Sequence, residues 1–180
     1  AVAAAAVSRD WDGEWEPIHE ALASFRGVRR RFERLGEANG VAVIDDYAHH
    51  PTEIEATLAA VRSMFPGARV VAAFQPHLYS RTRDFADAFG VSLALADLVY
   101  ITDVFPAREA PIAGITGETV VTALQRADQS DVRYVREVDA LAETLLGELR
   151  RGDVLVTLGA GSIEDVGQRV LDGLEASVHA

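Results

Sequence analysis

The chain has 180 residues, of which 49% are hydrophobic and 25% are charged, a balance typical of a folded globular protein rather than a disordered one. The formal net charge of −11 argues against a general nucleic-acid-binding surface, because phosphate binding needs clustered positive charge. Cysteine and lysine do not occur, which excludes disulfides, thiolate metal sites and lysine-based chemistry, and the longest apolar runs are too short to span a bilayer.

Residues 1–25 are predicted to form two short helices. Residues 1–8 are typical of a helix end rather than of a signal peptide, because no basic segment precedes the alanines. Residues 11–13 interrupt this helix, and residues 15–25 are predicted as an amphipathic helix that Gly27 ends. A domain boundary is therefore predicted between residues 25 and 28.

From residue 31 the pattern predicts a β-hairpin followed by alternating strands and helices. The hairpin strands are 31–35 and 41–44, joined by a turn at 38–40. A helix then begins at Pro51, and the later elements are strands at 69–74, 98–102, 132–135 and 154–158 and helices at 80–93, 118–127, 138–150 and 162–175. This order predicts an α/β fold with a Rossmann-like, mostly parallel sheet, one antiparallel edge strand and helices on both faces.

Ligands of such sheets bind beyond the carboxyl ends of the strands, so polar residues there are candidates for chemistry. The first such segment is 45–53, which holds two aspartates, a tyrosine and two histidines. One interpretation is a helix start in which His50 is the cap and Glu53 lies favourably in the first turn. That interpretation leaves the two adjacent aspartates, Asp45 and Asp46, and also Tyr47 and His49 unexplained. A metal site is a further alternative, although the spacing is not diagnostic.

The second segment, 74–84, also follows a predicted strand. Ser80 is predicted as a helix N-cap, which places Arg81 in the first turn, where a cation is unfavourable beside the positive end of the helix dipole. An arginine in such a place suits a ligand carboxylate or phosphate. The alternative is a solvated surface arginine, which is also the expectation for Arg83.

Two weaker signals lie elsewhere in the chain. Glycines at 159 and 161, between a strand and a helix, allow backbone N–H groups to approach an anion, although a tight turn capped by Ser162 is the alternative. Three consecutive arginines, Arg29, Arg30 and Arg31, indicate either a solvated patch at the domain boundary or a contact with a nucleotide phosphate.

Five blocks together resemble the C-terminal domain of the Mur ligases, in the family's order. They are residues 25–33, 45–53, 74–82, 103–109 and 157–163, and the second (DDYAHHPTE) and third (FQPH, then YSRT) are highly specific. The resemblance is strongest to the family member that joins L-alanine to UDP-N-acetylmuramate. The alternatives are the recycling ligase that attaches a tripeptide to the same UDP-sugar, a non-catalytic binding module derived from a Mur ligase and, remotely, a nicotinamide-dependent oxidoreductase.

The resemblance implies a cytoplasmic, ATP- and Mg²⁺-dependent ligase of peptidoglycan precursor synthesis. Residues 1–25 would be a helical remnant of the central ATP-binding domain and residues 26–180 the C-terminal domain, with UDP-N-acetylmuramate, L-alanine and the enzyme's own N-terminal and central domains as partners. The chain has no Gly-rich loop ending in lysine, so it is expected to hold no catalytic residue of its own and to be inactive alone.

The resemblance also implies roles for individual residues. ATP would be contacted at its phosphates, ribose and base by Arg31, Asp46 and Tyr47, respectively. L-Alanine would be surrounded by residues of the later blocks, with Arg81 as the carboxylate clamp: His49, His77, Arg81, Gly161 and Ser162. No metal ligand is expected in this chain. Leu78 departs from the family pattern, because many members have arginine there, so the clamp has one arginine fork or borrows another.

Overall fold

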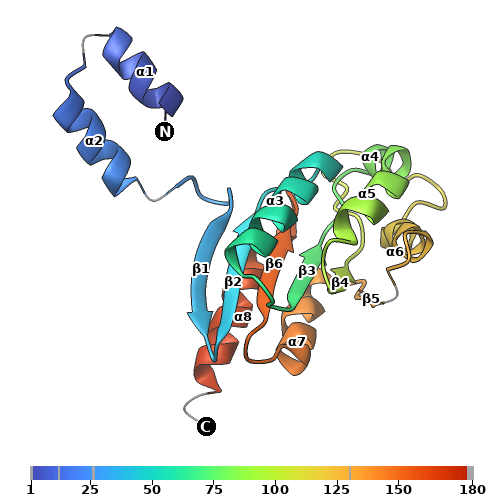
Figure 1. The fold of residues 1–180 in the computed structure, drawn as a ribbon. Helices are drawn as coiled ribbons and strands as arrows, with labels where there is room; N and C mark the ends of the chain where they lie inside the picture. The colour runs from blue at the N-terminus through green and yellow to red at the C-terminus, as the bar shows by residue number, and fades with distance from the viewer. Residues whose placement is uncertain (1, 12, 26, 130, 178–180) are drawn as a thin grey trace.

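The structure, a computed structural model, describes residues 2–11, 13–25, 27–129 and 131–177. Its centre is a six-stranded sheet with the order β1-β2-β6-β3-β4-β5 (Figure 1). The strands are β1 Glu33–Ala38, β2 Val41–Asp46, β3 Val70–Phe74, β4 Leu98–Ile101, β5 Val132–Tyr134 and β6 Val154–Leu158. The edge strand β1 is antiparallel to β2, whereas all other neighbours are parallel, which confirms the predicted fold class.

The described helices are α1 Val2–Asp10, α2 Trp15–Ser24, α3 Pro51–Met64, α4 Tyr79–Asp84, α5 Ala86–Leu93, α6 Gly117–Arg126, α7 Val138–Glu148 and α8 Val166–Ala176, with a 3₁₀ helix, η1, at Ser162–Asp165. Helices α3, α5 and α6 pack on one face, and α7 and α8 pack on the other. The alternation of strand side chains divides the core accordingly: in β3, Phe74 faces α3 and α5, whereas its neighbour Ala73 faces the α7–α8 layer.

The β1–β2 hairpin begins two residues later than the sequence pattern predicts. Arg30 and Phe32 both have positive φ angles, 57° and 51°, so the backbone cannot be extended there and β1 starts at Glu33. The connecting turn is at Asn39 and Gly40, whose φ angles of 52° and 73° suit the type I′ geometry that joins twisted antiparallel strands.

The predicted single helix at 80–93 is two helices. The helix is interrupted at Phe85, which is the C-cap of α4 and the N-cap of α5. Helix α4 starts at Tyr79, with Leu78 in the N-cap position. The prediction that Ser80 is the N-cap is therefore wrong. The last helix also begins differently, because residues 162–165 form the 3₁₀ turn η1 before α8 starts at Val166.

Helices α1 and α2 form a hairpin beyond β1, apart from the helices that cover the sheet (Figure 1). The turn between them is held by the Gly13 amide, which donates to the Ser8 carbonyl at 2.8 Å. Asp12 in this turn and Arg26 at the predicted domain boundary lie outside the described residues. The division into residues 1–25 and 26–180 stays a prediction. Within the described part of the chain, every helix is too short or too polar to cross a membrane.

Candidate functional site

The three segments that sequence analysis selected meet at one edge of the sheet. Strands β2, β6 and β3 are neighbours, and because they are parallel their carboxyl ends lie side by side. A row of side chains, Tyr47, His49, His77 and Arg81, runs along this edge. The ring centroids of Tyr47 and His49 are 5.2 Å apart, those of His49 and His77 are 5.9 Å apart, and Arg81 Nη1 lies 3.4 Å from His77 Nδ1.

Asp46 is buried at the end of β2 and accepts three hydrogen bonds from within the chain. Its Oδ2 accepts from the Phe32 amide at 3.1 Å and from the Thr57 hydroxyl at 2.9 Å, and its Oδ1 accepts from the Ala48 amide at 3.0 Å. One carboxylate therefore joins the β1 segment, the β2 end and α3. Its predicted contact with a nucleotide ribose would use the remaining acceptor capacity.

Arg31 and Tyr47 line one groove of about 310 Å³, together with Arg29, Arg30 and Glu164. The Arg31 guanidinium carbon lies 5.3 Å from the Tyr47 ring centroid, and its Nη1 is 4.0 Å from a Glu53 carboxylate oxygen, which is a long contact for an ion pair. More than half of the Arg31 side chain is exposed. The groove therefore offers an exposed cation and an aromatic face, which are suited to a phosphate and a planar base.

Arg30 differs from Arg31 although the two are adjacent in the sequence. Only 11% of its side chain is exposed, and all of its guanidinium nitrogens have partners in the chain. The sequence pattern does not distinguish Arg29, Arg30 and Arg31 from one another, and the resemblance assigns a role to Arg31 alone.

His50 and Glu53 form the start of α3, as one of the two interpretations of this segment predicts. The His50 ring accepts from the Thr52 amide, and Glu53 Oε2 accepts from the His50 amide at 3.2 Å, so both halves of a capping box are present. Burial alone would raise the pKa of Glu53, but the amides of His49 and His50 and the nearby charges outweigh it and lower that pKa. These two residues are accounted for by the helix start.

His49 is oriented by the backbone beside it. Its Nδ1 lies 2.9 Å from the Tyr47 carbonyl oxygen, which can only accept, so Nδ1 carries the proton. This contact fixes the ring in the row and leaves Nε2 on the opposite side of the ring.

His77 is kept neutral by its surroundings. Burial lowers its pKa, and the charges of Arg81 and His49 lower it further. Its Nδ1 faces Arg81 Nη1, which can only donate, so Nδ1 accepts. The His77 ring stacks on Phe105, with centroids 5.7 Å apart and planes 19° apart.

Arg81 forms no ion pair within 4.0 Å with any carboxylate of the described residues, whereas most other arginines of the sheet domain do. In the same helix, Arg83 pairs with Asp84 at 2.7 Å, as expected for a surface arginine. Arg81 is therefore a half-buried guanidinium with free donors at the sheet edge, which is the arrangement expected of a carboxylate-binding residue.

The glycine turn, residues 159–162, follows β6 and is held by the Gln75 side chain. Gln75 Nε2 donates to Ser162 Oγ at 3.2 Å, and the Ile163 amide donates to Gln75 Oε1 at 3.1 Å. A Cβ on Gly161 would lie 2.5 Å from Gln75 Oε1 and 2.6 Å from Phe105 Cγ, so only glycine fits. The alternative in which Ser162 caps the helix is wrong, because Gly161 is in the cap position and no side chain caps it.

The loop at residues 103–116 includes one of the five blocks, 103–109, to whose residues no individual role was assigned, and it supports the segment that holds His77 and Arg81. Leu78 donates its amide to the Phe105 carbonyl at 2.9 Å, and Glu109 accepts hydrogen bonds from both the amide and the hydroxyl of Ser80. The Ser80 hydroxyl is the main cause of the lowered pKa of Glu109. Glu109 therefore occupies the cap role that the sequence assigned to Ser80. Its position 29 residues downstream left no local signal.

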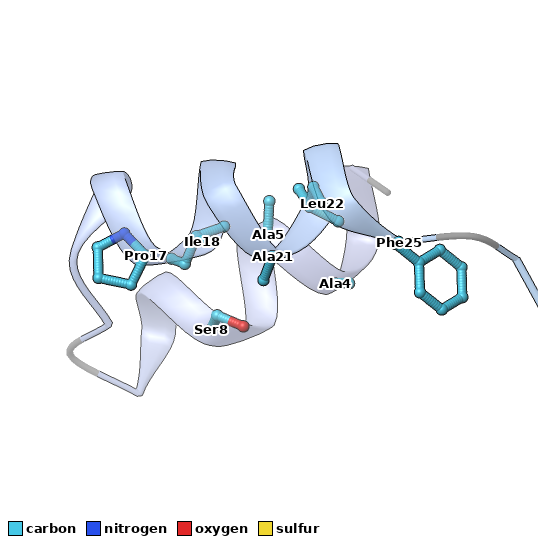
Figure 2. Close-up of a pocket in the computed structure, with 8 residues that line it drawn as sticks. All are labelled: Ala4, Ala5, Ser8, Pro17, Ile18, Ala21, Leu22 and Phe25. Atoms are coloured by element: carbon cyan, nitrogen blue, oxygen red, sulfur yellow. The ribbon is translucent and has the colours of Figure 1, made fainter.

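No group of three or more His, Asp or Glu side chains within the described ranges could hold a metal ion. A further groove of about 360 Å³ lies between α1 and α2, lined by residues such as Ile18, Leu22 and Phe25 (Figure 2). Because its lining has no titratable side chain, this groove offers packing surface but no acid–base or anion-binding chemistry.

The chain matches the protein family described as "Mur ligase, glutamate ligase domain" over residues 30–161, and it therefore belongs to the Mur ligases as a C-terminal domain of that family. Among curated relatives, the UDP-N-acetylmuramate–L-alanine ligase of Geobacter sp. (strain M21) is 46% identical over 177 residues. That match covers 98% of this chain but 38% of the relative, so the chain spans well under half the length of the proteins it resembles.

Solved structures agree with this assignment. A UDP-N-acetylmuramate–alanine ligase from Thermotoga maritima has a TM-score of 0.79 and 28% identity, covering 96% of this chain and 36% of that one. A murein peptide ligase from Psychrobacter arcticus has a TM-score of 0.69 and 27% identity, covering 87% of this chain and 32% of that one. The chain is thus similar to both kinds of ligase, and more so to the first.

Proposed function

We propose that this chain is the amino-acid-binding, nucleotide-closing C-terminal domain of a ligase that joins L-alanine to UDP-N-acetylmuramate with ATP. In such a reaction ATP activates the muramyl carboxylate as an acyl phosphate, and the alanine amine displaces the phosphate. Since the reaction uses ATP and precedes wall assembly, we place it in the cytoplasm. The proposal depends most on one observation: the guanidinium of Arg81 lies beside His77 at the sheet edge and has no carboxylate within 4.0 Å among the described residues.

The amino-acid half of the site suits a zwitterion. The fork of Arg81 can bind the alanine carboxylate in two parallel hydrogen bonds, and the glycine turn (Gly161 and Ser162) would contribute the Ser162 hydroxyl, which accepts from Gln75 Nε2 and can itself donate. The amine must lose a proton before it can attack. The Nδ1 lone pair of His77 accepts from Arg81, whereas His49 holds its proton on Nδ1 and is able to take the amine proton at Nε2. His49 forms the far wall of the same space, 5.9 Å from His77.

The nucleotide half of the site suits ATP. Arg31 has the exposure and charge to meet the phosphates, and the adjacent Tyr47 ring offers a stacking surface for the base. Asp46 shapes this half and would contact the ribose. The described residues provide no carboxylate cluster for Mg²⁺, so we assign its ligands, together with the phosphate-binding loop and the UDP-sugar site, to the parts of the ligase outside this chain.

The test compares two arginines of α4 in the full-length ligase. Arg81→Met should raise KM for L-alanine by about 10- to 100-fold, because a charge-assisted hydrogen bond contributes about 1.5–3 kcal/mol. KM for ATP should stay unchanged, and the matched variant Arg83→Met should behave as wild type. An unchanged KM for L-alanine in Arg81→Met would remove the proposed clamp.

The chain on its own should show no turnover. When it is incubated with ATP, Mg²⁺, UDP-N-acetylmuramate and L-alanine, phosphate release should not exceed a blank, and release above it would contradict the proposal. The recycling ligase stays the second candidate because of the similarity to the Psychrobacter enzyme. Offering the full-length ligase L-alanine or a tripeptide as the only amine separates the two functions.

A further inference from the structure

We infer that Arg30 is a positioning residue that couples the two halves of the site, an inference that rests on the proposed function. Its guanidinium contacts three separate segments: Nε donates to Asp45 Oδ2 at 2.8 Å, Nη2 donates to the Gly159 carbonyl at 2.7 Å, and Nη1 donates to Glu164 Oε2 at 3.2 Å. These partners lie at the end of β2, at the start of the glycine turn and in η1.

Arg30 also holds the aromatic part of the nucleotide groove. Its guanidinium carbon lies 5.3 Å from the Tyr47 ring centroid, and its carbonyl accepts the Tyr47 amide at 2.8 Å. Tyr47 is thus fixed through both its backbone and its ring. The same guanidinium reaches the glycine turn, so the position of Tyr47 and the position of residues 159–162 are set by one side chain.

The geometry requires an arginine. The Arg30 backbone has a φ of 57°, and its amide donates to Glu33 Oε2 at 2.7 Å, so the turn directs this side chain inward. Lysine would provide one compact charge, whereas the planar fork of arginine can meet a carboxylate and a carbonyl at fixed angles at the same time. Three of the five N–H donors of Arg30 are bonded within the chain and only 11% of its side chain is exposed, so Arg30 is less available to a phosphate than its exposed neighbour Arg31.

Removing Arg30 would leave the Asp45 carboxylate without its cation. Only 3% of the Asp45 side chain is exposed, and its other oxygen accepts from the Thr157 hydroxyl at 2.6 Å. A buried, unpaired carboxylate destabilises a fold strongly. With Arg30→Met alone, a change in KM could therefore come either from a less stable fold or from displaced site residues. The pair Arg30→Met/Asp45→Asn removes this buried charge and retains an acceptor for Thr157.

The experiment uses the full-length ligase and measures melting temperature and KM for ATP and for L-alanine. The melting temperature of the double variant should be close to that of the Asp45→Asn variant. Both KM values of the double variant should nevertheless rise by about tenfold, which is within the roughly 100-fold effect that a displacement of about 1 Å can have. Arg30→Lys, which keeps the charge beside Asp45, should also raise both. The control Arg34→Met, at an exposed pair with Glu37, should change neither.

Each result decides the inference. Normal KM values in the stable double variant or in Arg30→Lys would show that Arg30 serves only the fold and would overturn it. A rise for one substrate alone would overturn the coupling. Arg31→Met is measured in parallel and should raise KM for ATP only. Its failure to do so would remove the phosphate role of Arg31 from the proposed function without altering the reading of Arg30.

Discussion

The two halves of the proposed site, the nucleotide half and the amino-acid half, use their charged side chains in opposite ways. In the nucleotide half, Asp45 and Asp46 are buried and bonded within the chain, to Arg30 and Thr157 in one case and to two amides and a hydroxyl in the other. In the amino-acid half, Arg81 has no carboxylate partner within 4.0 Å among the described residues, and burial and the Arg81 charge lower the pKa of its neighbour His77.

This difference teaches that a polar cluster at a strand end combines supporting residues with ligand-contacting ones. The carboxylates of the nucleotide half build the loop that presents Tyr47 and Arg31, so their loss should act first on stability. The free cation of the amino-acid half supports little of the fold, so its loss should act on binding alone.

The largest effect is expected for Asp46→Ala. Three donors would lose a buried, charged acceptor, so the free energy of unfolding should fall by about 3–5 kcal/mol. Urea unfolding of the chain measures this change. Thr57→Val, which removes one of the three donors, should lower stability by about 1 kcal/mol. Unchanged stability in Asp46→Ala would break the comparison, because Asp46 would then act mainly as a ligand.

A smaller effect is expected for Gly161→Ala, which tests whether the glycine turn, like the carboxylates of the nucleotide half, contributes to the stability of the fold. The added methyl would meet Gln75 and Phe105, so the free energy of unfolding should fall by about 1–3 kcal/mol. Gly147→Ala in α7 is the control, since nothing lies within 4 Å of its Cβ, and it should stabilise the helix by about 0.5–1 kcal/mol. Equal stability of the two variants would show that the turn has room to adapt.

Much of the fold was predictable because it depends on local pattern. The strands alternate between two core layers, Pro51 starts α3 and Asn39-Gly40 forms the hairpin turn, all of which short stretches of sequence encode. The meeting of His49, His77 and Arg81 was predictable too, since carboxyl ends of neighbouring parallel strands share an edge.

The unpredicted features depend on partners distant in the sequence. Ser80 resembles a helix cap, but Glu109 occupies that role from another loop. Arg30 and Arg31 have the same chemistry, and only the left-handed turn separates a buried arginine from an exposed one. The interruption between α4 and α5 at Phe85 likewise has no adjacent glycine or proline from which it could be predicted.

The third prediction concerns Glu109, which supports the amino-acid half from outside. Glu109→Gln weakens the acceptor for the Ser80 amide and hydroxyl, so α4 should be held less firmly and KM for L-alanine should rise a few-fold in the full-length ligase. KM for ATP should not change. The control is Glu55→Gln, on the exposed side of α3. Equal rises for both substrates would show that the two halves are not independent at this position.

The smallest effect is expected for the titration of His77, followed by NMR in the chain. Burial and the Arg81 charge lower its pKa from the ordinary 6.5, so the folded state favours the neutral ring. The stability that this ring contributes is complete above the ordinary value and is lost as pH falls through the lowered one. Arg81→Met removes the second cause and leaves the burial, so the pKa of His77 should rise part of the way back. No rise would mean that Arg81 does not act on this imidazole, and the division between a supporting and a binding half would lose its electrostatic basis.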